Sequence, residues 1–237
     1  MPGAADPPRP VSGRERALAY LREKVLADPA VQGTFLNEQA IATAVGVSRT
    51  PVREALLILA ADELVRIEPK RGVYIPAMSA REINELFDLR GVLERHAASQ
   101  IVTGGETPEV ALRELLAGQR ELAARADDAL VAEFVVLDRD FHQTMVDSAG
   151  SALLSRTYAG LRERQLRAGQ AVVRNRRERW GEVCDEHGRI VDALAAGDPA
   201  ALHAAIDGHL HTTLTQLLSI SASSSMCRWT AARSRPV

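Results

Sequence analysis

Residues 36–65 read LNEQAIATAVGVSRTPVREALLILAADELV, and this stretch decides the fold of the N-terminal part of the chain. Apolar residues at helical spacing predict a short helix over Leu36–Val45, which ends in a turn at Gly46. Ser48 is a typical N-cap, and the apolar pattern after it predicts a second helix to about Ala61. Two helices joined by a glycine-containing turn have the layout of a helix-turn-helix.

The second helix of this pair is expected to enter the major groove of DNA by its N-terminal turn. Arginine suits bidentate contact with guanine, whereas serine and threonine hydroxyls suit phosphates. Two short β-prone stretches, Leu64–Glu68 and Val73–Ile75, predict a two-stranded wing that reaches the adjacent minor groove or backbone. The alternative is that the charges form only a solvated surface. The candidate DNA-binding residues are Ser48, Arg49, Thr50, Arg53, Lys70, Arg71 and Gly72.

The composition of the whole chain limits where nucleic acid could bind. Its 237 residues include 29 Lys and Arg against 31 Asp and Glu, a formal net charge of −2, so a DNA-binding surface must be a local patch. The two cysteines, Cys184 and Cys227, indicate no disulfide framework, which fits a reducing cytosol. Neither a membrane span nor a signal peptide is evident, so we expect a cytoplasmic protein without a membrane partner.

The sequence patterns divide the chain into four segments. Residues 1–12 are rich in Pro, Gly and Ala and are expected to form a disordered leader. Residues 13–77 contain the predicted winged helix-turn-helix. Residues 79–220 keep a helical period nearly throughout, which predicts an all-α bundle of six or seven helices. Residues 221–237 lose that period and are expected to form a flexible tail. The predicted fold class is therefore mainly α.

Four residues of the helical region have the spacing of metal ligands. Asp138 and His142 are four residues apart on a predicted helix, so their side chains project from one face. His187 and His209 stand about ten residues on either side of the turn at residues 197–199, hence at the same height on an antiparallel hairpin. One carboxylate and three imidazoles suit a divalent metal, with zinc as the first choice and nickel or manganese as alternatives.

Other interpretations of these residues stay open from the sequence alone. The four could be an accidental set of core side chains, because most histidines are surface or hydrogen-bonded core residues. Cys184 lies one turn before His187 and could compete as a ligand. Trp180 is expected to pack in the core rather than to stack on a ligand. The remaining histidines, His96, His203 and His211, have no such partners.

The residues of the N-terminal segment resemble a known family. SRTPVREAL, the preceding LNEQAIATAVGV and the following EPKRGVYI look like the GntR family of winged-helix regulators. The resemblance implies that Arg49, Thr50 and Arg53 make the principal operator contacts, with Gly72 at the wing tip. One departure is that the usual Pro-Gly before the second helix is replaced by residues 31–34, VQGT, which bears only on the conformation of that loop.

The helical segment resembles the FCD domain of the FadR-type branch of GntR regulators, through LFDLRGVLERHAA, LDRDFHQTMVDSAGS and EHGRIVDALAAGDPAALHAAIDGHL. Ser151 stands where that branch usually has asparagine. The resemblance implies a central cavity that holds a metal and, on it, a carboxylate effector. Arg90 is then expected to pair with that carboxylate. The alternative role for Arg90 is a structural one, in which it pairs with Glu94 four residues further along the helix. The metal ligands of that branch match Asp138, His142, His187 and His209.

These observations favour a transcription regulator, with a repressor as the first choice, that binds a palindromic operator as a homodimer. A small carboxylate effector bound in the helical region would control operator binding. Two other classes are weighed. A metal-dependent hydrolase could use the same four residues to activate water. A constitutive DNA-binding protein would use the bundle only as a structural element.

Overall fold

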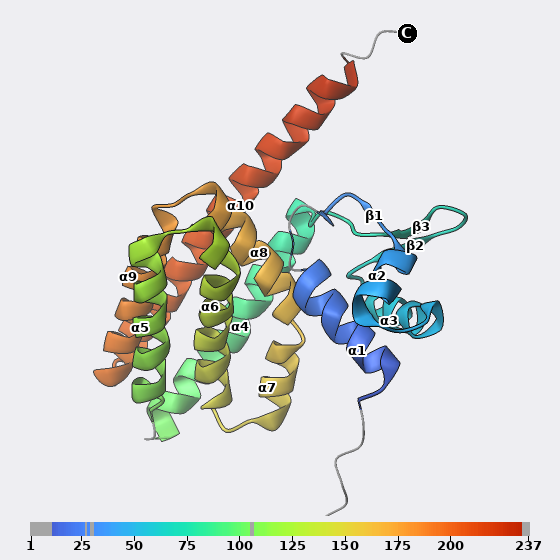
Figure 1. Cartoon of the computed structure of the whole chain (residues 1–237). Helices are drawn as coiled ribbons and strands as arrows, with labels where there is room; N and C mark the ends of the chain where they lie inside the picture. Colours follow the sequence, from blue (N-terminus) through green and yellow to red (C-terminus); the bar gives the residue numbers. More distant parts are fainter. Residues whose placement is uncertain (1–10, 27, 29–30, 105–106, 234–237) are drawn as a thin grey trace, which may run out of the picture. The chain divides into compact units, whose positions relative to one another are not determined.

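The computed structural model describes residues 11–26, 28, 31–104 and 107–233, and of residues 222–233 only the backbone (Figure 1). The expected leader, residues 1–12, lies outside the described residues except for its last two positions. The chain divides into two compact units, Met1–Ala77 and Met78–Val237. The expected boundary between residues 77 and 79 coincides with this division. Each unit is described by itself.

The N-terminal unit is a winged helix-turn-helix. Helix α1 spans Gly13–Tyr20, begins with a capping box between Ser12 and Glu15, and continues as a single π-helical turn over Leu21–Val25. Helix α2 (Glu38–Val45) ends at Gly46, whose φ of 71° suits glycine. The remaining elements are α3 (Arg49–Ala61), β1 (Phe35–Leu36), β2 (Arg66–Glu68) and β3 (Gly72–Tyr74).

The wing contains one strand more than the two predicted. The sheet order is β1-β3-β2, with both pairs antiparallel. Leu36 pairs with Val73 in this sheet, so the predicted helix start at Leu36 is wrong and α2 begins two residues later. Asn37 is the actual N-cap, and its side-chain oxygen accepts two backbone N–H groups. Ser48 occupies the N-cap position of α3 as predicted, without a side-chain capping bond.

The apolar faces of these elements form a separate core. Val52, Ala55, Leu56 and Leu59 of α3 are all buried, as the helical spacing requires. They pack with residues of α1, α2 and the wing, including Leu21, Leu26, Ile41, Leu64, Val73 and Ile75. This packing fixes α3 against the core of the N-terminal unit and leaves Arg49 and Thr50 in its first turn exposed.

The C-terminal unit is a bundle of seven α-helices within the described residues, as predicted. Helix α10 packs against α4 and α9, α5 packs against α6 and α9, and α6 packs against α8. No helix of the described residues is long and apolar enough to cross a membrane. The helices are α4 (Ala80–Gly104), α5 (Glu109–Arg125), α6 (Val131–Asp147), α7 (Ala152–Ala159), α8 (Arg162–Asn175), α9 (Arg179–Ala195) and α10 (Pro199–Arg233).

The last helix corrects one expectation about the chain. Residues 221–237 were expected to form a flexible tail, but α10 continues to Arg233. Neither glycine nor proline occurs between Gly208 and Pro236, so nothing in the sequence ends the helix earlier. The loss of apolar period in the sequence after residue 220 therefore did not mark the end of the helix.

Candidate functional site

The four predicted ligands come together in the helical unit. Asp138 and His142 lie one turn apart on α6, His187 lies on α9 and His209 on α10. One ligand atom from each of the four lies within 4.8 Å of the others. The three histidines are at most 2% exposed. Because a metal needs several donors at short range, this convergence is the geometry that a metal centre requires.

The turn between α9 and α10 explains why His187 and His209 meet. Gly197 adopts a φ of 64° after α9, a conformation that glycine tolerates well. Asp198 then caps α10 by accepting the backbone N–H groups of Ala200 and Ala201. The resulting hairpin places the two histidine side chains at one height, with ring centroids 4.8 Å apart.

A second set of side chains orients the three imidazoles. The Nδ1 atom of His142 lies 2.9 Å from a carboxylate oxygen of Glu94. The Nδ1 of His209 is hydrogen-bonded at 2.7 Å to Glu186, which adjoins His187 in sequence. In the same way, the Nδ1 of His187 is 2.7 Å from the side-chain oxygen of Gln119. The acceptors at Nδ1 of His187 and His209 favour a proton there and leave the Nε2 lone pairs for the centre of the cluster. The Nδ1 of His142 is close to Glu94, but the pair lacks hydrogen-bond geometry.

The Nε2 atoms accordingly face one another and Asp138. His142 and His209 approach to 3.1 Å between their Nε2 atoms. The Nε2 of His187 lies 3.5 Å from Asp138 and has no hydrogen-bond partner although it is buried. An unpaired buried nitrogen costs free energy unless a ligand satisfies it. Three imidazole nitrogens and one carboxylate oxygen therefore fit a divalent metal ion.

Two buried arginines hold the orienting carboxylates. Arg90 donates to Glu94 at 2.8 Å, and the Tyr158 hydroxyl donates to the same carboxylate at 2.7 Å. Arg179 donates two hydrogen bonds of 2.6 Å to the two oxygens of Glu186. The bidentate Arg179–Glu186 pair combines a strong interaction with a fixed orientation of the carboxylate. The orienting groups are thus themselves fixed by buried partners.

The electrostatics favour the protonation states that metal binding needs. Burial lowers the pKa of His187 well below its ordinary value, and the neighbouring histidines add to the effect. Burial also lowers the pKa of His209, although its hydrogen bond with Glu186 opposes this. For Glu186, burial would raise the pKa, but hydrogen bonds with His209 and Arg179 lower it to about 2. At neutral pH the His187 and His209 imidazoles are therefore neutral and the Glu186 carboxylate is ionised.

A small cavity adjoins this cluster. Arg90, Asp138, Gln165 and His209 are among its lining residues, and its volume is about 20 Å³, room for about one water molecule. Two buried donors that contribute to it, Nη2 of Arg90 and Nε2 of Gln165, have no hydrogen-bond partner within the described chain. The structural bridge between Arg90 and Glu94 is therefore present, and it leaves a donor of Arg90 free.

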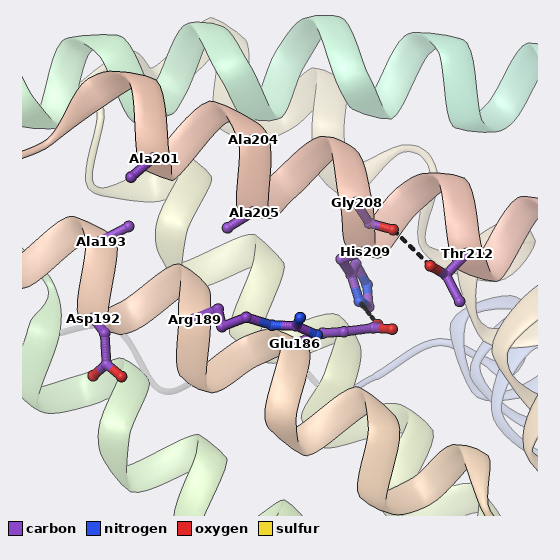
Figure 2. A pocket seen from close by; sticks show the side chains of 10 residues that line it. All are labelled: Glu186, Arg189, Asp192, Ala193, Ala201, Ala204, Ala205, Gly208, His209 and Thr212. Carbon is purple, nitrogen blue, oxygen red and sulfur yellow. Dashed lines mark hydrogen bonds and ion pairs between the residues drawn. The ribbon is translucent and has the colours of Figure 1, made fainter.

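A second, open groove lies between α9 and α10 (Figure 2). Its volume is about 600 Å³, and Ala201, Ala205 and Gly208 line one side. Figure 2 shows the Glu186 side chain reaching across this groove to the ring of His209. His209 lines both the groove and the small cavity, and Glu186 lines the groove.

The N-terminal unit presents the other predicted site residues at its surface. Ser48, Arg49, Thr50 and Arg53 are all exposed at the start of α3. At the wing, Lys70 and Gly72 have positive φ values of 66° and 107°, which form the turn between β2 and β3. Arg71 pairs with Glu68 and stacks over the Phe35 ring at 4.6 Å to its centroid. The predicted basic residues thus lie at the start of α3 and at the wing tip.

Comparison with known proteins identifies the two units. Residues 14–75 match the family described as bacterial regulatory proteins, gntR family, and residues 85–212 match the FCD domain. The chain belongs to the GntR family and carries an FCD domain.

Similar proteins agree with this family membership. The chain is 26% identical over 190 residues to the gluconate operon transcriptional repressor of Bacillus subtilis, which covers 78% of this chain and 77% of that protein. It is 30% identical over 161 residues to the HTH-type transcriptional repressor RspR of Escherichia coli, covering 66% of this chain and 67% of RspR. This GntR protein is therefore a transcriptional regulator, and the hydrolase alternative is set aside.

Solved structures support the fold of this GntR regulator. A putative GntR regulator from Rhodococcus sp. RHA1 superposes with a TM-score of 0.74 at 25% identity, over 87% of this chain and 97% of that one. E. coli McbR/YncC superposes with a TM-score of 0.72 at 22% identity, over 88% and 98% of the two chains, which supports the fold alone.

Sequence reasoning missed part of the site in this GntR regulator. Gln119 and Glu186 were not singled out, and Glu94 was considered only as a partner of Arg90. The sequence signal for Glu186 is its place directly before His187. Adjacent residues of a helix point to different neighbours, so a carboxylate there can contact another ligand, as Glu186 does with His209. Gln119 lies on α5, and nothing in its spacing indicates a role.

The side chains set aside in the sequence have other partners. Cys184 is buried outside the cluster, and burial raises the pKa of its thiol to about 11, which disfavours the thiolate form that binds metals. His203 is hydrogen-bonded to Ser99 at 3.0 Å. Trp180 packs on Phe134 with ring centroids 4.6 Å apart, so its predicted packing role is confirmed.

Proposed function

We propose that this regulator is a metal-containing repressor whose operator binding responds to a small carboxylate. The observation that carries the proposal is the convergence of three oriented imidazoles and Asp138 beside a cavity with unpaired buried donors. Asp138, His142, His187 and His209 would hold the metal, with zinc as the first choice and nickel or manganese as alternatives. When bound, the ion would supply a positive charge and open coordination positions for an anionic ligand.

The balance of charge supports a carboxylate ligand. Glu94 pairs with Arg90 and Glu186 pairs with Arg179, while Asp138 lies 3.5 Å from Nε2 of His187, so these five groups carry one negative charge together. Glu182 also contacts Arg179, at 3.4 Å, but it is 43% exposed and solvent screens its charge. A divalent ion would change this to one positive charge. A buried uncompensated charge is costly, so a monoanionic ligand would stabilise the loaded site. The free Nη2 of Arg90 would donate to that carboxylate, and Gln165 would donate from α8.

The small size of the cavity provides a route to regulation. A carboxylate does not fit into about 20 Å³, so its binding would require the helices that line the cavity to separate, for example α8 from α6. Gly169 already packs α8 tightly on α6, because a Cβ there would lie 2.8 Å from the side chain of Val135. A ligand that binds only the separated arrangement shifts the population toward it. Such a shift would change the operator affinity of the protein.

The DNA-binding part of the proposal concerns the exposed basic residues. Arg49, Thr50 and Arg53 would contact base edges and phosphates from the N-terminal turn of α3, with Ser48 at its cap. Lys70, Arg71 and Gly72 would contact the adjacent minor groove or backbone. We infer a homodimer on a palindromic operator, since two recognition helices one DNA turn apart match such a site.

Metal content of the purified full-length protein tests the metal site first. We expect about one zinc ion per chain after incubation with zinc and removal of excess ion. His187→Ala is expected to lose that ion because one of four ligands is missing. His96→Ala is the matched control, since His96 is exposed and outside the cluster. Equal metal content in the two variants would contradict the four-residue site.

Operator release by acids tests the effector site. Using an operator selected from random duplex DNA, we expect acetate or lactate, both monoanionic, to weaken DNA binding by the zinc-loaded protein. Gln165→Leu is expected to raise the acid concentration needed by about tenfold, the effect of one hydrogen bond to a charged group. Gln100→Leu, on the exposed face of α4, is the control. A response that is identical in both variants would remove Gln165 from the effector site.

A further inference from the structure

Glu38 links the two arginines that are proposed to contact DNA. It is the first residue of α2, outside the recognition helix. Its Oε2 accepts a hydrogen bond of 2.8 Å from Nε of Arg53 and one of 3.2 Å from Nη2 of Arg49. The Glu38 side chain is only 18% exposed, whereas those of Arg49 and Arg53 are 53% and 60% exposed. A single, partly buried carboxylate thus contacts both exposed guanidinium groups.

The position of Glu38 is fixed by the start of α2. Asn37 caps this helix by accepting two backbone N–H groups at 3.0 and 3.1 Å. The positive end of the helix dipole favours a carboxylate in the first turn. Burial would raise the pKa of Glu38, but the hydrogen bonds with Arg53 and Arg49 outweigh it and lower that pKa. The carboxylate is therefore ionised at neutral pH and held at a defined place.

A carboxylate at this place has two opposite effects on DNA binding. Its negative charge offsets one of the two arginine charges, which weakens attraction to the phosphates of any DNA. Its hydrogen bonds also restrict the rotamers of both arginines. Nε of Arg53 is engaged, whereas its two terminal nitrogens form no hydrogen bond within the described residues, and that end of a guanidinium can bind guanine O6 and N7 together. Restricted arginines lose less entropy when they make such a base contact.

We propose that Glu38 is a specificity-determining residue, which positions Arg49 and Arg53 for base contact and lowers affinity for unrelated DNA. This inference rests on the proposed function, in which the two arginines contact the operator. Glu38 itself acts through the arginines and is a positioning residue. Its removal should therefore affect discrimination between sequences more than it affects folding.

The test compares affinities for two DNA duplexes. The wild-type full-length chain selects its operator from random duplex DNA, and dissociation constants are then measured for this operator and an unrelated duplex of equal length. Glu38→Gln is expected to bind the unrelated duplex several-fold more tightly and to lower the ratio of the two affinities by about tenfold, the discrimination of one good arginine–guanine contact. Glu38→Asp keeps the charge but shortens the reach, so it should lower the ratio without the gain on unrelated DNA.

The matched control is Glu54→Gln. Glu54 is an exposed carboxylate on α3 that forms no hydrogen bond with either arginine in the described part of the chain. It makes the same change in net charge, and its affinity ratio should stay at the wild-type value. An unchanged ratio in Glu38→Gln, or an equal fall in Glu54→Gln, would overturn the positioning role. Wild-type operator binding by Arg49→Ala and Arg53→Ala would instead refute the proposed contacts of the arginines themselves.

Discussion

Glu94→Ala is expected to lower the free energy of unfolding of the helical unit by about 3–5 kcal/mol. Glu94 is fully buried and pairs with the buried Arg90, whose side chain is 5% exposed. Its removal leaves a guanidinium in the core without a counter-charge and the Tyr158 hydroxyl without its acceptor. Breaking one side of a buried pair costs much more than the pair contributes, because the remaining charge cannot reach water. Urea unfolding followed by circular dichroism would measure the loss.

Helix α4 provides a matched control for this prediction. Arg81 and Glu85 form a pair with the same i, i+4 spacing on the same helix, at 2.7 Å, but both side chains are exposed. Glu85→Ala should leave the unfolding midpoint close to that of the wild type, since exposed pairs are screened by water and salt. If Glu94→Ala lowers the free energy of unfolding no more than Glu85→Ala does, then Arg90 must find another partner or reach solvent in the variant.

The fold was predictable where it depends on local pattern. The apolar spacing and the capping signal at Ser48 predicted α3 to about Ala61, where it ends, and the breaks between apolar periods predicted the bundle. The strand β1 was missed because only two residues form it, and its partner β3 is about 37 residues further along the chain. Leu36 fits the helical apolar pattern equally well. A pairing at that distance has no local signal, so only the folded wing decides between helix and strand.

The convergence of the four candidate ligands was predictable because it also depends on local spacing. The spacing of Asp138 and His142 depends on one helix, and that of His187 and His209 on one hairpin. Glu94 and Gln119 lie on two other helices, and their contacts with the imidazoles depend on how α4 and α5 are rotated about their axes. That rotation is set by the packing of the whole core, which a single sequence does not specify. The orienting residues of a buried site are therefore harder to find than its ligands.

Zinc is expected to raise the thermal stability of the helical unit substantially. Without a metal, the buried Nε2 atom of His187 has no hydrogen-bond partner, and the Nε2 atoms of His142 and His209 lie only 3.1 Å apart. An ion that binds only the folded chain stabilises it by about 4 kcal/mol at a free concentration one thousand times its dissociation constant. For a domain of this size that corresponds to about 10 °C in the melting temperature. Thermal unfolding with added zinc, and after removal of zinc by a chelator, measures this shift.

Two variants separate metal binding from other effects of zinc. Asp138→Asn keeps the shape of the side chain but removes the ligand charge, so its melting temperature should rise much less with zinc than that of the wild type. His203→Ala removes a histidine outside the cluster that bonds to Ser99, and it should keep the full shift. An equal shift in both variants would mean that zinc binds elsewhere on the chain. No shift in the wild-type protein would mean that the four residues, although close together, form a metal-free polar core.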